Sequence, residues 1–378
     1  MYPRPLILGI ETSCDETAAA VVDSDGRVAS SVLSSQHDVH GKYGGVVPEL
    51  ASRRHIETVE SIVADAMQQA GLPWSSLSAV AVTRGPGLAG ALLVGVCFGK
   101  ALAYALKIPL IGVNHLEGHL ASAWIDEPDF PTPCIVLVVS GGHTHLFLVE
   151  SAGSYRLIGR TLDDAAGEAF DKAAKMLALG YPGGPAIDRM ARIGNKAAIR
   201  FPRPYRMRSN LDFSFSGIKT ALLYYLRDVD RSGTPRAVSD IAAGFQEAIV
   251  EVLVDKGFEA VRRFQVHALA VVGGVSANTR LRALLSERAR ATGVRLSLPR
   301  AAYCTDNAVM IAKAGHWAYA KGRFNAWDME ADADWTLPET HMADQREVLA
   351  CGPRPESSRP GRVAVSDGRK AHRRRPRA

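Results

Sequence analysis

Two histidines four residues apart, His115 and His119, have the spacing in this 378-residue chain that most directly suggests chemistry. They follow residues 110–114, an apolar run typical of a buried strand. On a helix, residues four apart share one face, with about 5–6 Å between their Cβ atoms. Their imidazoles could therefore hold one metal ion, although paired histidines on a solvated helix face are more common.

A zinc-protease site is another interpretation of this pair, and the sequence argues against it. The H-E-x-x-H pattern needs a glutamate directly after the first histidine, where this chain has Leu116. Glu117 would lie about 200° around the helix from His115 and would point away from the metal. The spacing therefore disfavours protease chemistry.

Two polar turns, each following an apolar run, could bind phosphate. The first spans residues 11–17, and the second spans residues 140–144. Gly141 and Gly142 lack the Cβ atoms that would keep backbone N–H groups away from a phosphate. Turns of Ser, Thr and Asp are common, so neither turn identifies a function alone.

The elements that must position these turns occur twice. Three strands and a helix are expected over residues 6–10, 17–22, 28–34 and 49–70, and again over 134–139, 145–150, 155–161 and 164–179. In each set a polar turn joins the first two strands. The sequence thus predicts an α/β protein with two duplicated lobes around a cleft.

Further downstream, a strand–turn–helix over residues 268–278 contains a double glycine, against which a flat ring could lie while the amide of Asn278 contacts its edge. An ordinary βα turn has the same pattern. Thr305 or Asp306 could cap the helix expected next. Asp171, in the 164–179 helix, could bind substrate or form a salt bridge with Lys175.

Charge and cysteine content restrict the class of protein. The net charge of +6 comes from residues 352–378, which hold nine Lys or Arg against two acidic residues, so this tail is expected to be disordered. Residues 200–208, with four arginines and two aromatics, suit RNA binding or form a solvated basic loop.

The five scattered cysteines indicate neither disulfides nor a thiolate metal site. With no membrane span or signal peptide identified, we expect a cytoplasmic protein without membrane contact.

Seven motifs follow one another along the chain. They are Gly-Ile-Glu-Thr-Ser-Cys-Asp-Glu-Thr, Asn-His-Leu-Glu-Gly-His, Val-Ser-Gly-Gly-His-Thr, Ala-Gly-Glu-Ala-Phe-Asp-Lys, Tyr-Pro-Gly-Gly-Pro, Phe-Ser-Phe-Ser-Gly and Gly-Gly-Val-Ser-Ala-Asn. In content and order they resemble the bacterial tRNA N6-adenosine threonylcarbamoyltransferase family, formerly described as glycoproteases. The match runs from about Leu6 to Gly322.

The resemblance implies the actin, heat-shock-seventy and sugar-kinase superfold. It places the lobes at residues 1–130, completed by about 300–325, and at 131–299, with 326–378 as linker and basic tail. It implies transfer of threonylcarbamoyl from threonylcarbamoyl-AMP to N6 of adenosine 37, with release of AMP, in tRNAs reading codons that begin with A. A smaller inactive paralogue and a small ATPase are the implied partners.

The resemblance also implies site residues. His115, His119 and Asp306 would bind one Fe(II), or zinc, as a facial triad with open coordination positions. The residues implied for the adenylate are Val138, Val139, Ser140, Gly141, Gly142, Asp171, Gly184, Asp188 and Asn278. Archaeal and eukaryotic relatives carry a metal-binding tyrosine where Val138 stands, so one protein ligand fewer is expected. Glu11 and Asp15 are candidate general bases.

Two other functions stay open at this point. The first is an ATP-dependent phosphotransferase or ATPase of the same superfold, which would leave the histidine pair unexplained. The second is a non-catalytic partner subunit, a class that would be marked by loss of that pair.

Overall fold

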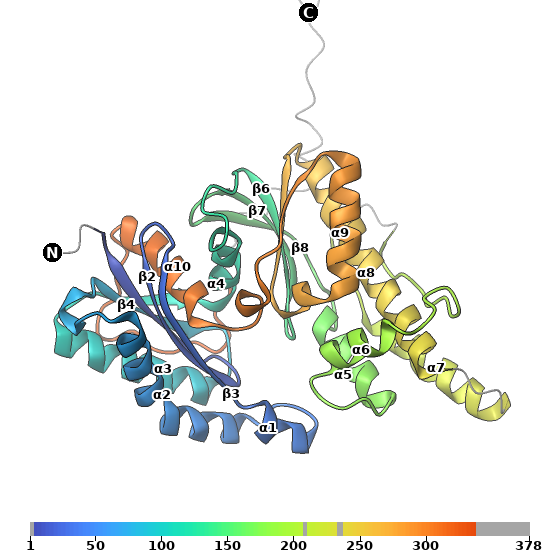
Figure 1. Cartoon of the computed structure of the whole chain (residues 1–378), viewed down its shortest axis with the longest axis horizontal. Coiled ribbons are helices and arrows are strands. Elements are labelled where there is room, and N and C mark those ends of the chain that lie inside the picture. Colours follow the sequence, from blue (N-terminus) through green and yellow to red (C-terminus); the bar gives the residue numbers. More distant parts are fainter. Residues whose placement is uncertain (1–3, 207–209, 233–236, 338–378) are drawn as a thin grey trace, which may run out of the picture. The chain divides into compact units, whose positions relative to one another are not determined.

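The computed structural model shown in Figure 1 describes residues 4–206, 210–232 and 237–337. It contains two five-stranded sheets. The first consists of β1 (Leu6–Glu11), β2 (Glu16–Asp23), β3 (Val28–Ser35), β4 (Ala79–Gly85) and β5 (Leu110–Asn114). The second consists of β6 (Cys134–Val139), β7 (Thr144–Ser151), β8 (Ser154–Arg160), β9 (Ala268–Val272) and β10 (Arg295–Ser297).

The two sheets share one topology. Their orders are β3-β2-β1-β4-β5 and β10-β9-β6-β7-β8. Each sheet begins with an antiparallel meander of three strands. A parallel strand then pairs with the first strand of the meander, and a second parallel strand pairs with that one. The central strands β1 and β6 are buried along their whole length, as expected for uninterrupted apolar runs. This repetition confirms the duplicated α/β fold predicted from the sequence.

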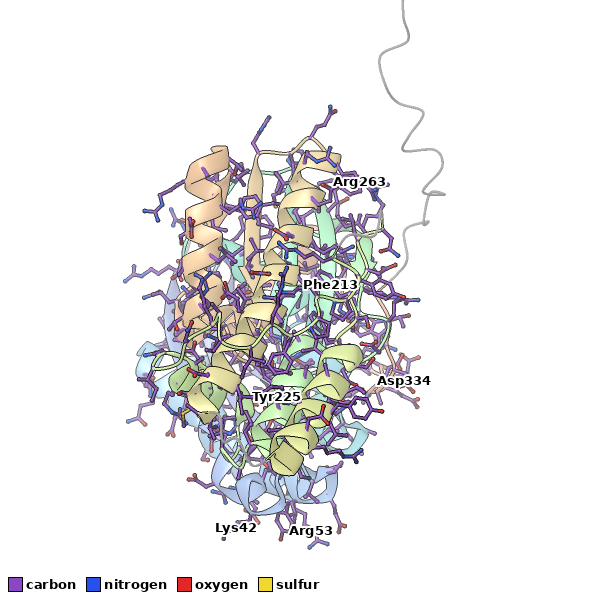
Figure 2. All side chains as sticks on the ribbon, turned by 90° about the vertical axis from the view of Figure 1, so that its right-hand side faces the viewer. Lys42, Arg53, Phe213, Tyr225, Arg263 and Asp334 are labelled. Atoms are coloured by element: carbon purple, nitrogen blue, oxygen red, sulfur yellow. The ribbon has the colours of Figure 1, made fainter. Side chains whose placement is uncertain are left out.

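The helices lie between and around these strands. They are α1 (His37–His40), α2 (Pro48–Ala70), α3 (Ala89–Leu106), α4 (His115–Ala121), α5 (Ala166–Met176), α6 (Gly183–Ala191), α7 (Ser216–Ser232), α8 (Val238–Arg263), α9 (Thr279–Thr292) and α10 (Ala308–Ala320). In Figure 2, Tyr225 is labelled on α7 and Arg263 at the end of α8.

The expected 164–179 helix is shorter in the structure, where α5 spans Ala166–Met176 and Ala178 has the left-handed φ of 55°. Asp163 accepts hydrogen bonds from the hydroxyls of Ser214 and Ser216, and so joins α5 to the start of α7. Helix α6 was not expected, because its sequence begins with Gly-Gly-Pro, which looks like a turn.

Helix α3 is, within the described residues, the one helix that is long and apolar enough to cross a membrane by length and composition, whereas the sequence analysis identified no such span. It packs against β4 and α2. Its Gly99 faces Val82 of β4, whereas Leu93 and Tyr104 are exposed. Helix α3 is thus a covering helix of the first sheet.

Helix α10 returns the chain to the first sheet after the second sheet is complete. It packs against β1, β2 and α4, and Figure 1 shows it beside β2 and away from α9. One hydrophobic core contains Ala81 of the first sheet, Val136 of the second and Ile311 of α10. Helices α4 and α10 therefore fill the space between the two sheets.

The contact between β1 and α10 depends on a glycine. A Cβ on Gly9 would overlap the carbonyl oxygen of Ala308 and lie 2.7 Å from the backbone nitrogen of Ala312. Because both neighbours are backbone atoms, they cannot yield as a side chain would. Gly9 thus sets the depth at which α10 packs.

We expect Gly9→Ala to destabilise the fold by about 1–3 kcal/mol or more, since it overpacks this contact. Urea denaturation of the full chain measures the loss. Gly41→Ala is the matched control, because a Cβ there meets no atom within 4 Å. Equal stability of the two variants would contradict the role of Gly9.

Candidate metal centre and substrate cavity

The histidine pair lies on a helix that starts at a defined residue. Asn114 ends β5 and caps α4, since its Oδ1 accepts a hydrogen bond of 2.9 Å from the backbone N–H of Leu116. His115 and His119 therefore fall on one face of α4, with ring centroids 4.7 Å apart. The predicted strand followed by a histidine helix is confirmed.

Asp306 lies against this pair, although it is nearly 200 residues further along the chain. Its Oδ1 is 3.2 Å from Nε2 of His119 and 3.5 Å from Nε2 of His115. The helix cap that we predicted at Thr305 or Asp306 is wrong, because Asn307 caps α10 by accepting from the N–H of Met310. Asp306 is thereby left to face the imidazoles.

The three side chains can hold a cation. Their ligand atoms all lie within 4.8 Å of one another. His119 is fully buried, and within the described residues the one polar group close to its Nε2 is the Asp306 carboxylate, 3.2 Å away without the geometry of a hydrogen bond. Buried polar atoms rarely lack a well-formed interaction, and an ion shared by Nε2 and Asp306 would supply one. Two imidazoles and a carboxylate suit a divalent transition metal.

The electrostatics of the site also favour a positive charge. Burial lowers the pKa of His115, yet the carboxylates of Asp306 and Glu11 raise it well above its ordinary value. Burial raises the pKa of Asp306, whereas His115 and His119 hold it well below its usual range. Both directions follow from the attraction between the buried carboxylates and imidazoles, which favours positive charge beside an ionised Asp306.

Glu11 lies behind His115. Its Oε2 is 3.2 Å from Nδ1 of His115 and accepts a hydrogen bond from Thr83, while its Oε1 accepts from the N–H of Ser13. The carboxylate is fully buried and does not line the cavity. This arrangement suits an orienting partner of a metal-binding histidine rather than the general base that we considered.

A cavity of about 650 Å³ opens beside the triad. Both lobes line it, with Ser13–Glu16, Gly44–Val46, Pro86–Leu88 and His115 from the first part of the chain, and Ser140–His143, Glu168, Asp171, Tyr181, Gly274, Thr305, Asp306 and Ala333 from the rest. Of the predicted site residues, the cavity thus brings together both phosphate turns, Asp171 and two of the metal ligands.

Asp171 does not form the salt bridge to Lys175 that was one of its two interpretations. Its Oδ1 accepts a hydrogen bond of 2.7 Å from the N–H of Gly183. Burial raises the pKa of Asp171, and the N–H groups of Gly183 and Gly184 oppose this shift. The N–H of Gly184 thus faces Asp171, but Gly184 is not among the residues that line the cavity.

The remaining predicted adenylate residues lie outside the cavity lining. Asn278 caps α9 through its Oδ1 and donates from Nδ2 to Gln246. Asp188 accepts from the hydroxyl of Thr279 at 2.7 Å. Val138 and Val139 are fully buried in β6. Their contacts in the structure are therefore with other parts of the protein, and their role in adenylate binding stays a prediction.

Several lining residues were missed or given another role in the sequence analysis. The glycine-rich turn before α3, which was not selected as a site, contributes Pro86, Gly87 and Leu88. Gly87 has a φ of 159°, and a Cβ there would lie 2.5 Å from the carbonyl oxygen of Ser13. Gly44, Gly45 and Val46 also line the cavity, and the double glycine at 44–45 was the sequence signal that could have identified this loop.

Of the three arginines in the described part of the basic loop over residues 200–208, Arg200 is exposed and the other two are held in ion pairs. Arg203 pairs with Glu251 at 2.9 Å, and Arg206 pairs with Glu251 and Asp255. These ion pairs fasten the loop to α8. This pairing differs from both predictions for the loop, since Arg203 and Arg206 are neither fully solvated nor free to bind RNA.

Residues 325–337, which we call the strap, are packed against the first sheet rather than forming the expected linker. The N–H of Asn325 donates to Leu110, and the N–H of Asp332 donates to Arg84. The carbonyl of Trp335 accepts from Nδ2 of Asn114, the residue that caps the histidine helix. The strap thus joins the rim of the cavity to α4. The predicted basic tail over residues 352–378 lies outside the described residues, as does the rest of the chain after residue 337.

Comparison with known proteins agrees with this geometry. A family model described as tRNA N6-adenosine threonylcarbamoyltransferase matches residues 27–313. Proteins of that name from Anaeromyxobacter sp. (strain Fw109-5) and Clostridium perfringens (strain SM101 / Type A) are 53% and 47% identical to the chain. The alignments cover 88% and 89% of this chain and 99% of each relative.

The chain belongs to the tRNA N6-adenosine threonylcarbamoyltransferase family. It is therefore a transferase that forms N6-threonylcarbamoyladenosine in tRNA. This assignment favours the transferase over the ATP-dependent phosphotransferase and the non-catalytic subunit that the sequence left open.

Solved structures establish the fold of this family member. HypF from T. kodakarensis covers 86% of the chain with a TM-score of 0.55 and 14% identity, and the chain covers 49% of that protein. Full-length HypF in a phosphate- and nucleotide-bound form aligns with 85% of the chain, with a TM-score of 0.56 and 13% identity. The alignment covers 47% of that HypF chain. The fold is the expected actin, heat-shock-seventy and sugar-kinase superfold.

We expect Glu11→Gln to weaken metal affinity by about 10–100-fold, because it removes the carboxylate that orients His115. A chelator-competition titration measures the affinity. Glu60→Gln, an exposed change on α2, should leave affinity unchanged. Wild-type affinity in Glu11→Gln would argue against the orienting role.

We also expect Asn114→Ser to lower the free energy of unfolding by about 0.5–1.5 kcal/mol, because serine can still cap α4 but cannot reach the strap. Asn114→Ala, which loses the cap as well, should cost about 1 kcal/mol more. Urea denaturation separates the two losses. Identical stability of Asn114→Ser and the wild type would show that the strap bond is not stabilising.

Proposed function

We propose that the cavity binds threonylcarbamoyl-AMP and that its threonylcarbamoyl group is transferred to N6 of adenosine 37, with release of AMP, in tRNAs reading codons that begin with A. The observation that supports this most is the triad of His115, His119 and Asp306 beside a cavity lined by both polar turns. One part of the site suits a cation, and the other suits a phosphate.

The chemical difficulty is the nucleophile. An exocyclic adenine amine is poor because its lone pair is delocalised into the ring, so the electrophile and the leaving group must be activated. When bound at the triad, Fe(II), or zinc, would act as a Lewis acid and stabilise the charge that develops on the carbamoyl and phosphate oxygens. His115, His119 and Asp306 would hold it.

The second polar turn would hold the phosphate. No atom lies within 4 Å of a Cβ built on Gly141 or Gly142, so a ligand can approach the backbone there. Both glycines and Ser140 line the cavity. Backbone N–H groups of such a turn bind anions without a charged side chain. We place the phosphate of the adenylate at this turn.

Asp171 would accept a hydrogen bond from the threonyl part of the substrate. It lines the cavity, and its Oδ1 is already fixed by Gly183, so the carboxylate is held in one orientation. We assign Asn278 and Asp188 to bracing the 273–279 turn, and Val138 to packing behind the metal helix. Of the two candidate bases, only Asp15 lines the cavity.

The assembly follows the resemblance. We propose that the chain acts in the cytoplasm with a smaller inactive paralogue and a small ATPase. Figure 2 shows Lys42 and Arg53 projecting from the edge formed by the start of α2 and the loop before it, where charged side chains are open to a partner or to tRNA.

We expect His119→Ala to lower product formation at least about a hundredfold, since a metal's charge stabilisation is worth several kcal/mol. The assay combines tRNA, threonine, bicarbonate, ATP and the accessory proteins, and metal content is measured alongside. His267→Ala, an exposed change outside the cavity, is the control. Full activity of His119→Ala without bound metal would overturn the metal role.

A further inference from the structure

We propose that the chain binds a second divalent cation, held by Asp15, Glu16 and His37 on the cavity wall, and that this cation neutralises the phosphate of the substrate. The phosphate role rests on the proposed function. The cation site itself rests on the geometry described below and can be tested without any substrate.

The three side chains converge on one point. Their ligand atoms all lie within 4.8 Å of one another. Nε2 of His37 is 3.3 Å from Oε1 of Glu16 and 3.9 Å from Oδ2 of Asp15. The two carboxylates lie where the first polar turn runs into β2, and His37 starts α1. Two oxygens and one nitrogen around one point are a common protein contribution to a divalent ion.

Asp15 lacks the partner that its burial requires. The residue is 6% exposed, and its Oδ2 accepts no hydrogen bond. Oδ2 is also the atom nearest His37, so it points into the cluster. A buried carboxylate oxygen without a donor is costly, and a cation at this point would remove the cost.

Glu16 shows the same deficit of positive charge. It is 8% exposed. Its ion-pair partner is His37, whose Nε2 also faces Asp15, so two neighbouring carboxylates share one imidazole. A bound cation would supply the further positive charge that this pair of carboxylates needs.

The charge of the whole cavity points the same way. Among the described residues, five carboxylates line it, Asp15, Glu16, Glu168, Asp171 and Asp306, and none of the lining side chains is a lysine or arginine. Of these five, Glu168 alone has a lysine partner in the described part of the chain, Lys172, at 2.7 Å. The substrate brings a phosphate and a carboxylate of its own. One divalent ion at the triad cannot balance this much negative charge.

The position of the cluster suits an ion that is shared with a phosphate. His37 has a half-exposed side chain and packs edge-on against Tyr181, with ring centroids 6.2 Å apart. Tyr181 lines the cavity and precedes α6 of the second lobe. Ions held by one or two carboxylates commonly complete their shell with water and substrate phosphate. A carboxylate that holds a cation is a poor proton acceptor, so the site also removes Asp15 from the candidate bases.

The test counts cations on the full chain, with Mn²⁺ as the probe. After equilibrium dialysis, metal per chain is measured by plasma mass spectrometry. We expect two Mn²⁺ for the wild type, and one each for Glu16→Gln, His37→Ala and His119→Ala. Asp38→Asn, an exposed acidic neighbour of His37, should retain two. Circular dichroism melts verify that each variant is folded.

One Mn²⁺ on the wild type, or two on both Glu16→Gln and His37→Ala, would overturn the second site. The phosphate role is tested with AMP by calorimetry in the presence of Mn²⁺. We expect Glu16→Gln to bind AMP at least tenfold more weakly than Asp38→Asn does. Equal AMP affinities would overturn that role. Because neither readout uses tRNA or threonylcarbamoyl-AMP, failure of the proposed transfer reaction is detected separately.

Discussion

The structure depends on bringing a carboxylate from the C-terminal part of the chain against two buried imidazoles. Asp306 lies 3.2 Å from His119, and no local interaction could hold such a pair together. Helix α10 does so by packing on β1 and α4 immediately after Asn307 caps it. The close approach of Gly9 to α10 therefore helps to position Asp306, although Gly9 itself is remote from the histidines in the sequence.

Duplication supplies the second half of the site. Each sheet begins with a meander whose first turn is polar, and both turns reach the same cavity. The two turns differ in charge. The first carries Asp15 and Glu16, whereas the second offers glycine backbone at 141–142. One fold unit used twice thus yields a wall suited to cations and a wall suited to anions.

The sequence predicted what depends on local pattern. Uninterrupted apolar runs predicted β1, β6 and β9, and the i,i+4 histidines predicted that His115 and His119 share one helix face. Helix α6 was missed because Pro185 looks like a breaker, although proline is tolerated in the first turn of a helix.

Side-chain roles were harder to predict than elements. The amide of Asn278 looked like a ligand contact, but the same amide can cap a helix, and local spacing does not distinguish the two. Glu11 looked like a base until its three hydrogen-bond donors were known. The strap has no periodicity, and its hydrogen bonds join residues more than 200 positions apart, so nothing local marked it as ordered.

The strap has a consequence for the order in which the protein is made. The N–H of Gly87 donates to the carbonyl of Ala333, and Ala333 lines the cavity. Ribosomes build chains from the N-terminus, so a wall segment near residue 333 is added after nearly everything else described above. The part of the cavity wall that Ala333 forms is therefore missing until residue 333 has been synthesised, and the cavity can shield a reactive substrate from water only after that point.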